Sequence, residues 1–132
     1  MKILFVCSGN AYRSPLAEAI LKKLRPDLEV DSAGLHVAIP VSKEVKDYLK
    51  KLNAELYLKS LAESLDEKIL RDYDIIVAMQ SSHKHAVLRR CPECENRIMV
   101  WNIEDPYFEE QENAVKIYNE IENKVKELAN SL

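Results

Sequence analysis

The sequence predicts an α/β fold in which a parallel β-sheet is covered by helices on both faces. Short apolar runs alternate with amphipathic helical stretches along the whole chain, which is the order of a β-α-β protein. The apolar run at residues 3–6 is continuous rather than alternating, which is typical of a strand buried on both faces. No repeat, linker or low-complexity tract divides the 132 residues, so we expect a single domain over residues 1–132.

The expected strands and helices follow from the spacing of the apolar residues. Pro15 suits the first turn of the helix that follows the first strand. Asp66 is expected to cap a short helix that reaches Leu70. The expected strands cover residues 3–6, 28–31, 75–79 and 98–101, and the longer helices cover residues 15–24, 41–52, 81–90 and 114–128.

The composition excludes several classes of protein. With 47% hydrophobic residues, 31% charged residues and a net charge of -3, the chain has an ordinary globular balance and no basic field for nucleic acid. The apolar run at the N-terminus spans about five residues, far fewer than a signal peptide or a membrane span needs. Three cysteines, an odd number, disfavour a secreted disulfide framework. We therefore expect a cytoplasmic protein without a nucleic-acid or membrane partner. We further expect a monomer that needs no cofactor or metal.

The segment from Cys7 to Ser14 combines an anion site with a nucleophile. It follows a buried strand and precedes a helix, and ligands of parallel sheets bind at the carboxyl ends of the strands. The backbone N–H groups of residues 8–13 and the helix N-terminus are expected to hold an oxyanion. Arg13 adds a planar fork for two of its oxygens. The same positive groups favour the thiolate of Cys7, which makes it a nucleophile at neutral pH.

Other residues are expected to support this loop. Ser14 is placed to hydrogen-bond the thiolate, and Asn10 to hold the loop while tolerating a left-handed conformation. The only glycines, Gly9 and Gly34, each follow an expected strand, where a positive φ or a close backbone approach would require them. No loop residue protonates a leaving oxygen well, so a separate general acid is required.

The residues around the loop resemble the low-molecular-weight protein tyrosine phosphatase family. The resemblance extends in order over essentially the whole chain and implies a four-stranded parallel sheet flanked by helices, with the phosphate-binding loop after the first strand. It rests on Val6-Cys7-x-Gly9-Asn10-x-x-Arg13-Ser14-Pro15 and Ala17-Glu18-Ala19, then on Ser32-Ala33-Gly34, Ile75-Ile76-Val77-Ala78-Met79 and Asp105-Pro106-Tyr107-Phe108.

The resemblance also implies roles for individual residues. Cys7 would attack phosphorus, Arg13 would bind the phosphoryl group, and Ser14 would support the thiolate. Asp105 would protonate the leaving phenol oxygen and then activate water, whereas the residues Asp105-Pro106 alone indicate only a turn. The implied substrates are phosphotyrosine proteins or small aryl phosphates, and the product is inorganic phosphate. The substrate-binding residues would be Ser8, Gly9, Asn10, Ala11, Tyr12 and Tyr107.

Three positions and one segment depart from the family pattern or leave it open. Tyr12 stands where the family usually has a second cysteine, so a protective disulfide with Cys7 is not expected. The ring of Tyr12 is a candidate pocket wall, or it only shields the loop. Gln80 stands where Asp is common, which puts a local support contact in doubt. The segment 35–40 is shorter than the family's substrate-lining segment. Ala11 is neither the Thr of phosphoarginine-preferring relatives nor a larger aliphatic residue, and we favour phosphotyrosine over phosphoarginine.

A second constellation lies before the last expected strand. Cys91 and Cys94, with His83 and His85 upstream, offer four ligands of types that zinc accepts, but the spacing is unfamiliar and the histidines would point apart on a helix. A reversible disulfide is a further possibility. We expect two unpaired thiols.

Two rival functions remain open. A thiol-dependent arsenate reductase on the same scaffold would pass the oxidised sulfur of Cys7 to a distal cysteine pair, although Ser14-Pro15 is the phosphatase version of the loop. A non-catalytic phosphate-binding module would keep the loop alone, and it would need neither the thiol of Cys7 nor Asp105.

Overall fold

The computed structural model describes residues 1–132 and contains one four-stranded parallel sheet in the order β2-β1-β3-β4. The expected α/β class is therefore confirmed. Cys7 pairs with Gly34 in the register of the first two strands, and Val6 pairs with Ala78 of the third, so three strands end at the same edge. The strands are β1 (Lys2–Cys7), β2 (Glu29–Gly34), β3 (Ile75–Ala78) and β4 (Ile98–Val100).

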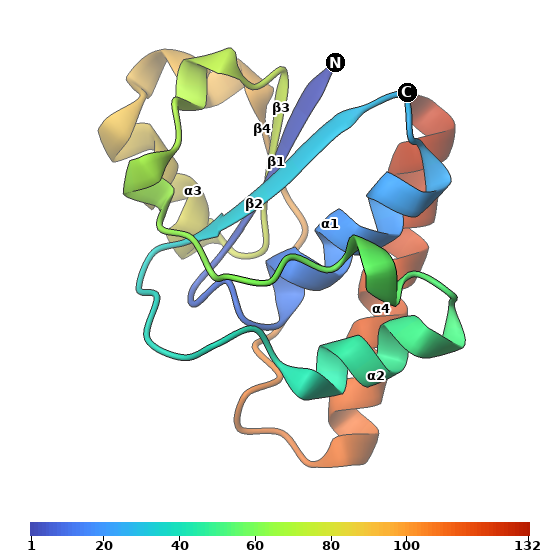
Figure 1. Cartoon of the computed structure of the whole chain (residues 1–132). Helices are drawn as coiled ribbons and strands as arrows, with labels where there is room; N and C mark the ends of the chain where they lie inside the picture. Colours follow the sequence, from blue (N-terminus) through green and yellow to red (C-terminus); the bar gives the residue numbers. More distant parts are fainter.

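Helices cover both faces of the sheet (Figure 1). One face carries α1 (Arg13–Leu24), α2 (Lys43–Lys51) and α4 (Gln111–Ser131). The other face carries α3 (Ser81–Arg90) and the 3-10 helix at Pro92–Arg97. Shorter 3-10 helices lie at Glu55–Tyr57, Leu65–Glu67 and Leu70–Asp72. None of the helices is both long enough and apolar enough to cross a membrane.

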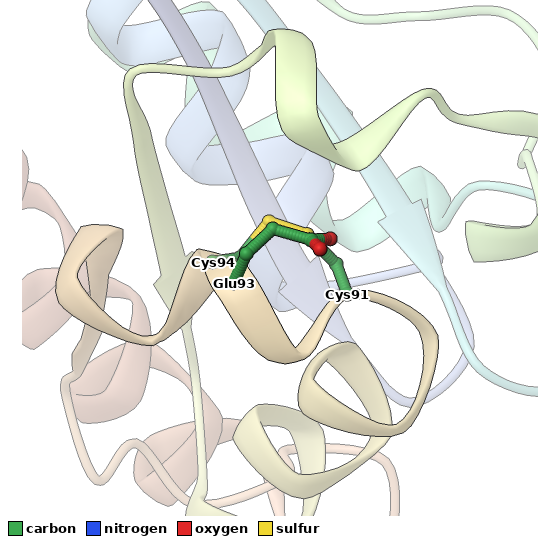
Figure 2. A group of neighbouring side chains, drawn as sticks. All are labelled: Cys91, Glu93 and Cys94. Carbon is green, nitrogen blue, oxygen red and sulfur yellow. A yellow bond between two sulfur atoms is a disulfide. The ribbon is translucent and has the colours of Figure 1, made fainter.

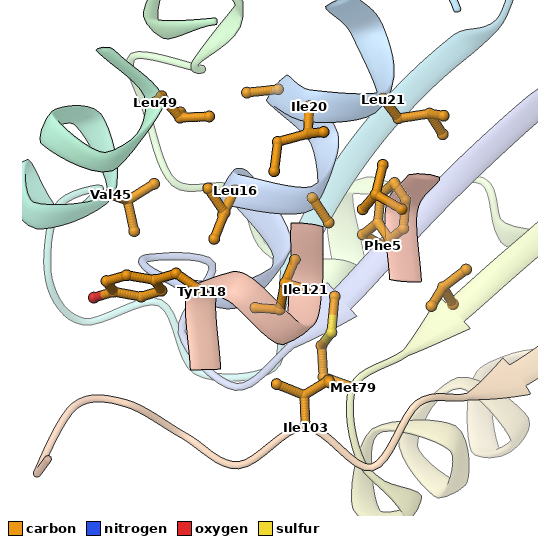
Figure 3. Packing of buried hydrophobic residues seen from close by; sticks show 14 of the residues in the cluster. Phe5, Leu16, Ile20, Leu21, Val45, Leu49, Met79, Ile103, Tyr118 and Ile121 are labelled. Atoms are coloured by element: carbon orange, nitrogen blue, oxygen red, sulfur yellow. The ribbon is translucent and has the colours of Figure 1, made fainter. Parts of the chain in front are cut away.

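The continuous apolar run of β1 serves both cores at once. Successive side chains of a strand point to opposite faces, so Phe5 joins the larger core while Leu4 and Val6 join the smaller one, and all three are fully buried. Figure 3 shows side chains from β1, α1, α2 and α4 meeting in the larger core, with Leu16 and Ile121 among them. β1 is thereby packed on both faces, and the loop that follows it starts from the middle of the fold.

The expected cap at Asp66 is wrong. Ser64 caps the 3-10 helix Leu65–Glu67, and its hydroxyl accepts from the N–H of Asp66 at 3.2 Å. The Glu67 carboxylate accepts in return from the N–H of Ser64 at 3.3 Å. This reciprocal pair is a capping box, and it places the start of the helix two residues earlier than the side chain of Asp66 would.

Candidate active site

The loop between β1 and α1 turns its carbonyl groups outward and leaves its amides free. The carbonyl oxygens of Cys7 and Ser8 accept from the N–H groups of Leu35 and His36, at 3.2 and 2.8 Å. The N–H groups of residues 8–12 donate to no protein acceptor. Because buried backbone donors are nearly always paired, a run of free amides in one loop indicates an anion site.

The N-terminus of α1 opens onto the same loop. The helix begins at Arg13, and no side chain caps its first turn. The unpaired N–H groups and the positive end of the helix dipole therefore point at the loop. Pro15, which has no N–H to leave unpaired, occupies the first turn as the sequence predicted.

A close approach between β2 and the loop explains why position 34 is a glycine. A Cβ on Gly34 would lie 2.6 Å from the backbone nitrogen of Asn10, so no larger residue fits there. Asn10 itself has a φ of 53°, and the expected left-handed conformation is confirmed. The expectation for Gly9 is wrong, because its φ is not positive and a Cβ would meet only the carbonyl oxygen of His36 at 3.8 Å.

The catalytic thiol candidate has a directed hydrogen bond. The Sγ of Cys7 lies 2.9 Å from the Oγ of Ser14, and both side chains are buried. Asn10 Nδ2 donates to the same Ser14 oxygen at 2.8 Å. Since Ser14 accepts from Asn10, its own proton is available for the sulfur, which favours the thiolate.

Asn10 is held by a buried network beneath the loop. Its Nδ2 also donates to the Oγ of Ser32 at 2.9 Å, and its Oδ1 accepts from the N–H of Glu63 at 2.8 Å. Ser32 in turn donates to buried Glu18 at 2.5 Å and accepts from Lys59 Nζ at 3.2 Å. We call Cys7, Ser14, Asn10 and Ser32 the thiol side of the loop.

Arg13 makes its two shortest hydrogen bonds through one nitrogen, NH1. Its buried NH1 donates to Gln80 Oε1 and to the carbonyl oxygen of Ile103, each at 2.8 Å. NH2 lies 3.3 Å from the Oγ of Ser8 and 3.7 Å from the Oδ2 of Asp105, and Nε has no protein acceptor. Two donors of the guanidinium thus stay available for an oxyanion. The support contact at Gln80 that the sequence left in doubt is present.

The contact of His83 with the loop was not predicted from the sequence, which indicated His83 only as a candidate zinc ligand. Its ring is buried, its Nδ1 accepts from the N–H of Gln80 at 3.0 Å, and its Nε2 lies 2.9 Å from the Oγ of Ser8. Burial and the neighbouring Arg13 guanidinium lower the pKa of His83 to about 4, against the opposing charge of Asp105. The ring is therefore neutral at physiological pH. The available signal was its place just after β3, beside the end of β1.

The loop opens into a cavity of about 230 Å³. Tyr12 and Tyr107 form one wall, with their rings edge to face at 6.0 Å and 78°. The segment 35–40 contributes another wall, so it lines the site despite its short length. Ser14 and Asn10 are fully buried and do not line the cavity. The lining residues are Cys7, Ser8, Gly9, Ala11, Tyr12, Arg13, His36, Ala38, Ile39, Asp105 and Tyr107.

Asp105 lies at the rim of the cavity. Its side chain is 44% exposed, whereas that of Arg13 beside it is 2% exposed. Asp105 Oδ1 accepts from the N–H of Tyr107 at 3.0 Å, which confirms the turn that the sequence predicted. We call Ser8, Arg13, Gln80, His83 and Asp105 the phosphoryl side of the loop.

The two distal cysteines form a disulfide (Figure 2). The expectation of unpaired thiols is wrong: the turn through Pro92 brings the Cα atoms of Cys91 and Cys94 to 5.4 Å, a separation that a disulfide can span. The four-ligand zinc grouping is also wrong, because His83 points to Ser8 and His85 is exposed. Cys7 is the one free cysteine.

The fold and the loop define an α/β protein with a candidate anion site beside a free cysteine, and the comparisons with known proteins specify its family. Residues 2–132 match the family model described as low molecular weight phosphotyrosine protein phosphatase. The chain therefore belongs to the low-molecular-weight protein tyrosine phosphatases, which are phosphoric monoester hydrolases.

Individual relatives match this chain over nearly their whole length. The chain is 34% identical to the low molecular weight protein-tyrosine-phosphatase Etp of Escherichia coli K12, and the match covers 98% of this chain and 93% of Etp. The structure of Vibrio vulnificus Wzb in complex with benzylphosphonate matches with a TM-score of 0.89 and 28% identity, covering 99% of this chain and 98% of Wzb. The YwlE arginine phosphatase from Geobacillus stearothermophilus matches with a TM-score of 0.87 and 30% identity, covering 98% of this chain and 91% of YwlE.

Proposed function

We propose that the protein hydrolyses phosphotyrosine in proteins, or small aryl phosphates, through a cysteinyl-phosphate on Cys7. The observation that carries this proposal is the run of free N–H groups at residues 8–12 beside a thiol that Ser14 hydrogen-bonds. That arrangement places an anion site and a nucleophile at one point.

In the first step, the Cys7 thiolate attacks phosphorus and the bond from phosphorus to the phenol oxygen breaks. The electron pair of that bond leaves with the oxygen, which takes a proton from the Asp105 carboxyl group. The free donors of Arg13 and the loop amides hold the three phosphoryl oxygens as charge develops on them.

In the second step, water replaces the sulfur on phosphorus. Asp105, now a carboxylate, takes a proton from the water as its oxygen attacks, and the bond from sulfur to phosphorus breaks. Cys7 leaves as a thiolate, which the hydroxyl of Ser14 stabilises, and inorganic phosphate is released.

The walls of the cavity support an aryl substrate. Tyr12 and Tyr107 offer ring faces and edges to a planar group that enters above the loop. Vibrio vulnificus Wzb, the similar structure, holds benzylphosphonate, an aromatic phosphonate. Phosphoarginine is the second candidate, supported by the likeness to an arginine phosphatase.

One set of assays separates the candidates. Peptides with phosphotyrosine, phosphoarginine and phosphoserine are compared for phosphate release, with Cys7→Ser as the inactive control. The proposal expects phosphotyrosine to be cleaved fastest, and preferential release from phosphoarginine would overturn the substrate assignment. Thiol consumption with arsenate, lost in Cys91→Ser, would indicate a reductase, and anion binding without turnover would indicate a binding module.

The proposal includes a single domain over residues 1–132 that acts as a cytoplasmic monomer on phosphorylated proteins. Sedimentation at micromolar concentration tests the monomer, and cell fractionation tests the compartment.

A further inference from the structure

The side chain of Ser8 sits between two donors at the edge of the anion site. Its Oγ lies 2.9 Å from His83 Nε2 and 3.3 Å from Arg13 NH2. Ser8 also lines the cavity, next to Cys7. A hydroxyl oxygen accepts two hydrogen bonds and donates one, so the direction of each contact decides where its proton points.

The tautomer of His83 follows from its other nitrogen. The N–H of Gln80 donates to His83 Nδ1 at 3.0 Å, and a backbone N–H cannot act as an acceptor. Nδ1 therefore carries the lone pair, and in the neutral ring the proton is on Nε2. The buried ring stays neutral because its surroundings disfavour the imidazolium. His83 is thus a donor to Ser8.

Arg13 is also a donor to Ser8, because a guanidinium has no acceptor. With both of its acceptor positions filled, the hydroxyl of Ser8 must direct its own proton elsewhere. No protein acceptor receives that proton, and the remaining direction is the cavity.

We infer that the Ser8 hydroxyl donates a hydrogen bond to the bound phosphoryl group and that His83 is the residue that orients it. This inference rests on the proposed function, since it assigns a further donor to the same anion site. Ser8 would bind substrate through its side chain as well as its backbone, and His83 would be a positioning residue that touches no substrate.

The inference predicts that the two residues act through each other. Removing the hydroxyl in Ser8→Ala should lower kcat/KM on an aryl phosphate about 10-fold and weaken inhibition by inorganic phosphate to a similar extent, the usual range for one hydrogen bond to a charged group. His83→Phe keeps a ring but removes the donor, and should cause a smaller loss in the same direction.

A double-mutant cycle tests this coupling. His83→Phe is measured in the native background and in the Ser8→Ala background, and the loss should nearly vanish in the second. His83→Gln, which keeps an N–H donor, should retain more activity than His83→Phe. Equal losses from His83→Phe in both backgrounds, or an unchanged phosphate inhibition constant in Ser8→Ala, would overturn the inference.

Two further measurements keep the outcome clear. Thermal unfolding of each variant checks that His83→Phe folds, and His83→Gln carries the test if it does not. Calorimetric binding of inorganic phosphate reports on the Ser8 donor without turnover. If the native protein binds phosphate but hydrolyses no phosphate ester, the proposed function fails, whereas a loss of phosphate affinity in Ser8→Ala would still support the donor.

Discussion

The two sides of the phosphate-binding loop are prepared for substrate in different ways. On the thiol side, the side-chain amide of Asn10 donates to Ser14 and Ser32, and the hydroxyl of Ser14 faces the sulfur of Cys7. On the phosphoryl side, NH1 of Arg13 donates to Gln80 and Ile103 and NH2 donates to Ser8, whereas Nε and the second N–H of NH2 remain for a ligand. The nucleophile is therefore set before substrate arrives, whereas the anion donors are completed only by the substrate.

The largest effect should come from Asp105→Asn, which removes the acid from the phosphoryl side and leaves the thiol side intact. We expect activity on a poor leaving group such as phosphotyrosine to fall about 10²–10⁴-fold, the range of general acid catalysis. The loss on p-nitrophenyl phosphate should be much smaller, because that phenol leaves without a proton. Steady-state rates on a series of phenols measure this, and equal losses on all of them would remove Asp105 as the acid.

Arg13→Lys should come next, with kcat lower by about 10²–10³-fold on every aryl phosphate, as for the loss of a transition-state donor. A lysine keeps the charge but cannot donate to two oxygens while also bonding Gln80 and Ile103. The rate of Cys7 alkylation by iodoacetamide at pH 7 should fall far less than kcat does. A variant that keeps near-native kcat would show that the guanidinium geometry is unimportant.

Ser14→Ala tests the thiol side alone. Loss of the hydroxyl removes the hydrogen bond to the Cys7 thiolate, and such bonds to charged groups contribute about 1.5–3 kcal/mol. The rate of Cys7 alkylation by iodoacetamide at pH 7 should fall by about 10-fold or more. Inhibition by inorganic phosphate should stay close to native. If phosphate affinity fell and the alkylation rate did not change, the division between the two sides would be wrong.

The smallest expected effect is on stability, and it concerns a titratable group on the phosphoryl side. The pKa of His83 is near 4 in the folded chain and 6.5 as an ordinary histidine, so the unfolded chain binds a proton first as pH falls. Protonation of His83 in the unfolded chain therefore lowers the free energy of unfolding as the pH falls below about 6.5. The expected loss is about 1 kcal/mol at pH 6.

Urea unfolding at pH 7.5 and pH 6 measures this loss, and His83→Gln is the matched control. The native protein should lose more stability than the variant between the two pH values, while His36 and His85 contribute to both. Identical pH dependence in the two proteins would mean that His83 is not held neutral.

The thiol side could be predicted from sequence because most of it is local. Cys7, Asn10 and Ser14 belong to one short segment between a strand and a helix, and the left-handed conformation of Asn10 follows from its residue type. The fold class could be predicted for a similar reason. Continuous apolar runs and helical spacing report burial directly, and β1 is indeed buried on both faces.

The phosphoryl side could not be predicted in the same way, because its partners depend on which strands are neighbours. Gln80 and His83 reach the loop only because β3 lies beside β1, and Ile103 only because the chain after β4 passes the same edge. The disulfide was missed for a different reason. A pair of free thiols and a disulfide-bonded pair have the same sequence, so the spacing of Cys91 and Cys94 alone does not distinguish them.

The most direct test of the central claim is to trap the phosphorylated enzyme. The protein is mixed with excess p-nitrophenyl phosphate, quenched within the first turnovers and digested, and the peptides are analysed by mass spectrometry. The account predicts one phosphoryl group on the sulfur of Cys7, and no labelled peptide in Cys7→Ser. A phosphoryl group on another residue, or turnover that persists in Cys7→Ser, would contradict it.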